Sequence, residues 1–201
     1  LGDVYKRQNL GRMGLAVAPS SPNIIYALIE AKKNALYKSI DGGFHWKKIN
    51  DRNEIGNRPF YYSDLRVDPK NENRIYSIFT YVHVSEDGGN SFSELMPAYN
   101  VSNGVHPDHH AWWIHPDDPN YMIDGNDGGL NLTRDRGKTW HFAQNIPVGQ
   151  FYHIAVDNDI PYNIYGGMQD NGSWAGPAYT WRVQGIRNSY WQEISFGDGF
   201  D

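Results

Sequence analysis

The sequence predicts an all-β protein made of repeated four-stranded antiparallel units. The first reason is an octet of the form [Ser/Thr]-x-Asp-x-Gly-x-x-[Trp/Phe], which occurs three times. Its copies start at Ser39, Ser85 and Thr133, so they are 46 and then 48 residues apart. The second reason is composition, because 21 glycines and 14% aromatic residues suit a sheet protein rich in turns. A period of this length is typical of propeller blades.

Each octet is expected to close a tight hairpin turn. Its hydroxyl and carboxylate accept bonds from nearby backbone N–H groups, its glycine supplies a positive φ, and its last residue packs an aromatic ring under the turn. The residues with these roles are Ser39, Asp41, Gly43 and Trp46, then Ser85, Asp87, Gly89 and Phe92, then Thr133, Asp135, Gly137 and Trp140. The three aspartates are therefore interpreted as structural, with calcium binding as the alternative.

Alternating apolar residues predict the first strand of each unit, in segments that begin at Gly14, Asp64, Ala111 and His153. A second strand follows each one at a constant offset, with its core at residues 25–26, 75–76, 122–123 and 164–165. A third strand leads into each octet and a fourth leaves from its aromatic residue. Four strands per unit is the pattern of a β-propeller blade.

The repeats place approximate blades at residues 9–58, 59–105, 106–147 and 148–195, with residues 196–201 opening a fifth blade. In the fourth unit the octet is degenerate and residues 176–188 form an insertion. The chain is therefore expected to be a propeller fragment of about four blades, whose exposed edges make it marginal in isolation. Residues 1–8 lack an initiator Met and resemble translated sequencing-adapter sequence, which puts the native start near Asn9.

Composition excludes several classes of function. The 18 basic and 23 acidic residues give a formal net charge of −5, so the chain has no basic footprint for nucleic acid. No apolar run approaches the ~20 residues of a transmembrane segment, and no secretory signal is visible. The chain contains no cysteine, and no cofactor is expected.

Candidate site residues gather at the rim opposite the octets, where the loops before the first strands meet the hairpins between second and third strands. The segment His106 to His110 has the densest set of ionisable side chains. It is interpreted either as a metal or general acid/base site, or as a polar loop whose histidines bond to nearby backbone. No paired zinc-ligand spacing accompanies it, so no particular metal is indicated and metal support of this loop stays open.

Carboxylates form the second group of candidates. Asp127 and Asp170 occupy equivalent hairpins in successive units, while Asp64 and Asp198 stand before first strands. Two carboxylates across a cleft are the equipment of a glycoside hydrolase, in which one protonates the leaving oxygen and the other activates water or attacks. The alternative is an ordinary tight turn, which we favour for Asp127. The segment around Asp170 is longer than a two-residue turn requires.

The octets and the blocks between them resemble the bacterial BNR/Asp-box repeat proteins, which are often labelled glycosyl hydrolases. The propellers of that family are related to the sortilin N-terminal domain and to xyloglucanases. The resemblance covers Asn9 to Asp201 and rests on the octets together with residues 11–14, 61–64, 108–110, 125–129, 166–173 and 197–199. The octet is specific for Asp-box propellers and says little about activity.

The resemblance implies a secreted, periplasmic or outer-surface bacterial protein that hydrolyses or binds a glycan. Xyloglucanase-like relatives place catalytic aspartates in a cleft between two propellers. No motif assigns either of these two acids to a position in this sequence. Sialidases use an arginine cluster and a Tyr nucleophile, a set that Arg12 and Tyr61 do not establish. Sortilin-like relatives bind peptides in a channel without catalysis, so the alternative partner is a peptide or protein. Fold analogy does not choose among these functions.

The expected site residues form two sets that share one rim. The catalytic set is Asp108, His109, His110, Asp170 and Asp198. The binding set is Arg12, Tyr62, Asp64, His106, Asp127 and Asn171. The expected partner is a polysaccharide or other glycan.

Overall fold

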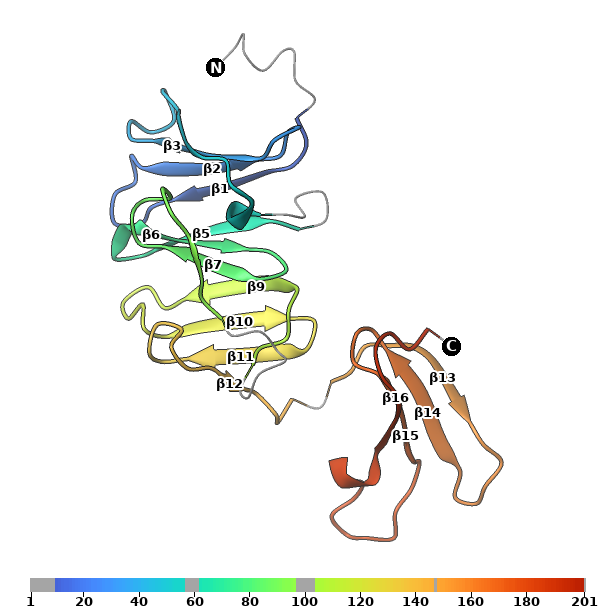
Figure 1. The fold of residues 1–201 in the computed structure, drawn as a ribbon. Helices are drawn as coiled ribbons and strands as arrows, with labels where there is room; N and C mark the ends of the chain where they lie inside the picture. Colours follow the sequence, from blue (N-terminus) through green and yellow to red (C-terminus); the bar gives the residue numbers. More distant parts are fainter. Residues whose placement is uncertain (1–9, 57–61, 97–103, 147, 201) are drawn as a thin grey trace. The chain divides into compact units, whose positions relative to one another are not determined.

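A computed structural model confirms the all-β fold, with four four-stranded antiparallel sheets (Figure 1). The structure describes residues 10–56, 62–96, 104–146 and 148–200. The predicted N-terminal tail and Tyr61 lie outside these described residues. The chain divides into two compact units, Leu1–Ala143 and Gln144–Asp201, and each is described by itself.

Every sheet follows the chain order, so that each strand pairs with the next one through a hairpin. The first sheet contains β1 (Met13–Val17), β2 (Ile25–Ile29), β3 (Ala35–Ser39) and β4 (Lys47–Asn50), and the second contains β5 (Asp64–Asp68), β6 (Asn71–Ile78), β7 (Val82–Ser85) and β8 (Ser93–Glu94). The third contains β9 (His109–Ile114), β10 (Met122–Asn126), β11 (Gly129–Thr133) and β12 (His141–Phe142), and the fourth contains β13 (Phe151–Val156), β14 (Asn163–Met168), β15 (Ser173–Pro177) and β16 (Gln192–Ser195). Short 3-10 turns occur at Asn53–Ile55 and Asn188–Tyr190.

The first unit stacks its three sheets (Figure 1). Two apolar cores lie between them. The core between the first and second sheets is built from Ala16, Ala18, Tyr26, Leu28, Leu36, Ile55, Leu65, Val67 and Ile75. The core between the second and third sheets is built from Tyr76, Ile78, Val82, Val84, Met96, Val105, Trp112, Met122 and Trp140. Burial of these side chains is the main favourable term that holds one sheet on the next.

Equivalent apolar positions of the first strands differ in burial. Leu65 on β5 is fully buried, whereas Leu15 on β1 is 65% exposed. In β5 the side that carries Leu65 packs on the first sheet, and successive strand residues face opposite sides. In β1 the side that carries Ala16 packs on the second sheet, and Leu15 and Val17 face away from it. Sequence alternation therefore predicts the strand but not which apolar face is covered.

The three octets close the turns after β3, β7 and β11 with the same bonds. Their hydroxyl groups accept the N–H of Gly43, Gly89 and Gly137 at 2.9, 2.8 and 3.0 Å. Each hydroxyl also donates to its own aspartate at 2.8 Å, and these aspartates are Asp41, Asp87 and Asp135. The carboxylates in turn accept the N–H of His45, Ser91 and Thr139 at 2.9 Å. The glycines have φ values of 97°, 92° and 89°, which a residue with a Cβ rarely adopts.

In the second unit the residues after β16 fold back on the β14–β15 turn. The N–H of Gly199 donates to the carbonyl of Met168 at 3.0 Å, and Gly172 donates to Gly197 at 2.8 Å. Within residues 196–200, where the sequence predicts a new blade, the structure has no strand. No helix in the described part of the chain is long and apolar enough to cross a membrane.

Candidate functional site

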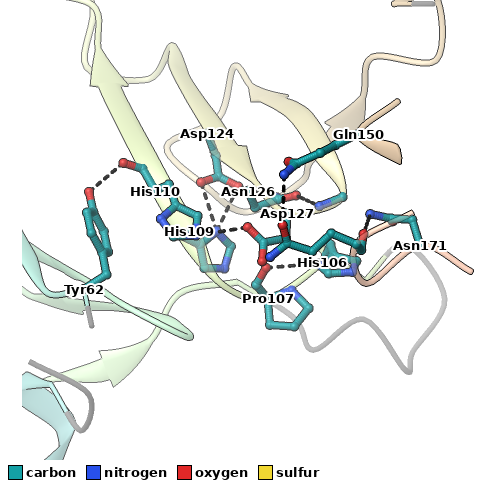
Figure 2. A network of polar contacts seen from close by, with 12 residues as sticks. Tyr62, His106, Pro107, His109, His110, Asp124, Asn126, Asp127, Gln150 and Asn171 are labelled. Carbon is teal, nitrogen blue, oxygen red and sulfur yellow. Dashed lines mark hydrogen bonds and ion pairs between the residues drawn. The ribbon is translucent and has the colours of Figure 1, made fainter. Parts of the chain in front are cut away.

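In the first unit, predicted site residues from three sheets meet in what we name the Tyr62 cluster: Arg12, Tyr62, Asp64, His110 and Asp127. The Tyr62 hydroxyl donates to the His110 carbonyl at 2.6 Å, and the two rings lie 5.0 Å apart (Figure 2). His110 Nε2 lies 3.0 Å from Asp127 Oδ1. The Arg12 guanidinium lies 5.6 Å from the centre of the Tyr62 ring. The cluster therefore combines an aromatic ring, a cation and an imidazole–carboxylate pair.

Local structure of the β10–β11 hairpin positions Asp127. The Asn126 side chain accepts the N–H of Gly128 at 2.9 Å, which closes the turn. The N–H of Asp127 donates to the Asp108 carbonyl at 3.3 Å, which ties the turn to the segment before β9. The backbone of Asp127 thus belongs to a tight turn, as the favoured interpretation has it, while its carboxylate contacts His110.

The Tyr62 cluster is partly open to solvent. The His110 side chain is 38% exposed and the Asp127 side chain 16%. Burial, and after it the Asp64 carboxylate, raises the pKa of Tyr62, so its hydroxyl stays a hydrogen-bond donor at neutral pH. Asp64 accepts the N–H of Leu65 at 2.8 Å and forms an ion pair with Arg66. These bonds order the polar groups before any ligand arrives.

His109 does not face solvent but forms a buried bond network with Asp124 and Asn126 (Figure 2). Its Nδ1 lies 2.9 Å from both Asp124 oxygens, and Asn126 donates to Asp124 at 2.8 Å. His109 is 2% exposed and Asp124 is fully buried. Because a carboxylate accepts hydrogen bonds, this partner places a ring proton on Nδ1.

Sequence reasoning missed Asp124. A usable signal existed, since Asp124 and Asn126 are two polar residues at alternate positions of a strand and therefore share one face. The register places Asn126 opposite His109. The cross-strand neighbour thus identifies which polar groups the histidine meets.

The other two predicted residues of this segment have backbone roles. His106 Nδ1 lies 3.0 Å from the Pro107 carbonyl, and a Cβ added at Gly128 would lie 2.6 Å from the His106 Cβ. Asp108 has a φ of 59° and donates its N–H to the Thr80 carbonyl at 2.9 Å. The three histidines of this segment, His106, His109 and His110, therefore contact different partners. Among the described residues, no three His, Cys, Asp or Glu side chains are grouped so as to hold a metal ion.

The remaining predicted residues lie in the second unit. Asp198 accepts the N–H of Asp170 at 3.0 Å and the hydroxyl of Tyr152 at 3.4 Å. Asn171 donates to the Gln169 carbonyl at 2.8 Å, and its own carbonyl accepts the Trp174 indole N–H at 2.7 Å. Asp170 and Asn171 thus lie in the β14–β15 turn, and Asp198, which follows β16, bonds to that turn.

No protein-family model and no curated protein sequence matches the chain. Solved structures similar to it include an ancestral GH74 enzyme, with 17% identity, a TM-score of 0.51 and coverage of 82% of this chain and 22% of that one. A GH74 xyloglucanase from Xanthomonas campestris has 18% identity, a TM-score of 0.48 and coverage of 92% and 32%. YCF48 from Cyanidioschyzon merolae has 14% identity, a TM-score of 0.46 and coverage of 90% and 55%.

The chain thus spans between about a fifth and about half of the length of these proteins. At such identities the likeness to the ancestral GH74 enzyme shows a shared propeller fold and nothing of the chemistry. A functional conclusion has to rest on the Tyr62 cluster itself.

Proposed function

We propose that the Tyr62 cluster binds a polysaccharide, as part of an extracellular glycosyl-hydrolase-like propeller of bacterial origin. The observation that carries the proposal is the half-buried Tyr62 ring, at the edge of the core between the second and third sheets, beside the His110–Asp127 pair. A sugar ring presents an apolar C–H face and a rim of hydroxyl groups. An aromatic ring suits the face, and ordered planar polar groups suit the hydroxyls.

The polar groups of the cluster are suited to recognition of neutral sugars. Asp127 and Asp64 are each held by a partner, His110 and Arg66, so their carboxylates are oriented rather than mobile. Sugar hydroxyls donate to such carboxylates and accept from Arg12. A few placed polar groups beside an apolar surface are what fixes the orientation of a ligand.

Hydrolysis would need a second property, a carboxyl group that delivers a proton to the leaving oxygen while another carboxylate activates water or attacks. Asp170 and Asp198 are proposed for these two roles within the second unit, where Asp198 accepts the N–H of Asp170. The resemblance of the sequence to propellers related to xyloglucanases makes xyloglucan the first polymer to test.

The test is a binding and turnover assay of the whole chain on a polysaccharide panel that includes xyloglucan. Tyr62→Ala and Asp127→Asn are each expected to weaken binding about tenfold, the loss of one aromatic or charge-assisted contact. Tyr162→Ala is the matched control, because Tyr162 is 48% exposed and lies in the other unit. Equal affinity of Tyr62→Ala and the unaltered chain for every glycan would contradict the proposal. Recovery of a peptide ligand lost in Tyr62→Ala, with no glycan binding, would replace it by the peptide-binding alternative.

A further inference from the structure

We propose a second binding site, for an acidic saccharide unit such as a uronic acid, at the octet end of the first two sheets. A cavity of about 430 Å³ lies there, outside the Tyr62 cluster and within the first unit. Its lining includes Lys38, Lys47, His45, Trp46, Ile49 and Asn90. This size falls in the range of small-molecule sites.

Two lysines give the cavity its charge. Lys38 and Lys47 are directly opposite each other on β3 and β4, so both side chains lie on the same face of the sheet. Like charges in this arrangement repel each other. Within the part of the chain that the structure describes, neither lysine forms an ion pair. A bound anion would relieve that repulsion.

The acidic groups near the cavity are Asp41, Asp87 and Glu72, and each accepts a hydrogen bond from a hydroxyl group, which for Asp87 is that of Ser91 at 2.6 Å. Asp41 Oδ2 lies 2.6 Å from His45 Nδ1, and Asp41 also accepts the Ser39 hydroxyl. Glu72 raises the pKa of Tyr26, after burial as the larger cause, and its carboxylate accepts the Ser20 hydroxyl at 3.3 Å. The Lys38 ammonium lies over the Tyr26 ring, 5.2 Å from its centre.

The remaining walls favour a ring-shaped ligand over a bare anion. The Trp46 indole is fixed by a 2.8 Å bond from its Nε1 to the Gly43 carbonyl, and Ile49 adds apolar surface beside it. An indole face packs well on the C–H face of a sugar ring. An acidic peptide would instead be expected to pair with the outer strand through its backbone, without need of Trp46.

The test titrates trigalacturonate into the whole chain by calorimetry. Saturable binding is expected, and Lys38→Gln and Lys47→Gln are each expected to weaken it about tenfold, since a charge-assisted contact is lost. Lys48→Gln is the matched control, because Lys48 points to the other face of β4 and bonds to Asp51 at 3.1 Å. Trp46→Phe is expected to weaken binding as well, and the methyl ester of trigalacturonate is expected not to bind.

Several outcomes would overturn this proposal. If Lys48→Gln weakened binding as much as the other two lysine variants, the attraction would be a general effect of charge. If sulfate or a glutamate peptide bound as tightly as trigalacturonate, the site would not recognise a sugar ring. Absence of saturable binding to the unaltered chain would also overturn it. Tyr62→Ala is expected to leave trigalacturonate binding unchanged, so failure here and failure of the Tyr62 cluster are separate results.

Discussion

His110 Nε2 lies 3.0 Å from Asp127 Oδ1, and this contact joins the first strand of the third sheet to the hairpin between its second and third strands. Because both side chains are partly exposed, we expect the pair to contribute little to folding. A double-mutant cycle with His110→Gln and Asp127→Asn should give a coupling of about 0.2–1 kcal/mol in urea unfolding. A coupling several times larger would make the pair structural rather than a poised recognition element.

The free energy of unfolding should respond very differently to two equivalent leucines. Leu65→Ala should lower it by about 2–5 kcal/mol, because the side chain is fully buried between two sheets and a cavity remains. Leu15→Ala removes the same atoms at the equivalent repeat position, where 65% of the residue is exposed. It should change stability by less than about 0.5 kcal/mol. Similar losses in urea unfolding for both variants would contradict the described packing.

Acid should destabilise the octet turns. The Ser91 hydroxyl is the largest cause that lowers the pKa of Asp87 to about 2, from an ordinary value of 3.8. Asp41 and Asp135 also have pKa values lowered to about 2, chiefly by the N–H of His45 and the hydroxyl of Thr139. A depressed folded-state pKa stabilises above the unfolded value, and that stabilisation is lost as pH falls from about 4 to about 2.

Urea midpoints measured across this pH range check the acid prediction. The unaltered chain should lose stability steadily below about pH 4. Asp87→Asn removes one titrating group, so its midpoint should be lower at neutral pH and fall less steeply in acid. A parallel fall for the two proteins would show that Asp87 is not linked to folding.

Removal of one charge from the cross-strand lysine pair should raise stability. Lys47→Gln should increase the free energy of unfolding by about 0.2–1 kcal/mol at low salt, because like charges directly opposite each other destabilise a sheet. Lys38→Gln should gain less, because it also loses the contact of the Lys38 ammonium with the Tyr26 ring. Salt should shrink the gain by screening the repulsion. Lys48→Gln, which loses a bond to Asp51, should not stabilise. Thermal melts at two salt concentrations measure all three variants.

The sequence predicts the repeated strands well because its signals are local. The octet glycines and aspartates specify a turn by themselves, and alternation within a few residues marks each strand. Contacts between sheets are harder to predict from the sequence. Which side of β1 is covered depends on packing against another sheet, so the exposure of Leu15 and Val17 is not encoded in their own strand.

In the candidate site, too, the local features can be predicted from the sequence and the contacts between distant residues cannot. His110 and Asp127 can be named because they stand at the start of a first strand and in the hairpin after the second strand of a regular repeat. The buried bond from His109 to Asp124 depends on the register of β9 with β10, which includes a bulge. The return of residues 197–200 to the β14–β15 turn depends on close approach of Gly199 to Gly167, where an added Cβ would lie 2.0 Å from a carbonyl oxygen. The alternation of Asp124 and Asn126 shows that they share one face of β10, but which histidine they meet, like the approach of Gly199 to Gly167, is set by residues distant in the sequence.

The central claim, that the Tyr62 cluster binds a polysaccharide, is tested most directly by NMR titration of the whole chain with a xyloglucan oligosaccharide. The account predicts that the imidazole signals of His110 and the ring signals of Tyr62 shift together and saturate, while the buried His109 signals change little. Saturable binding that leaves His110 and Tyr62 unshifted, or no binding to any glycan of the panel, would contradict it.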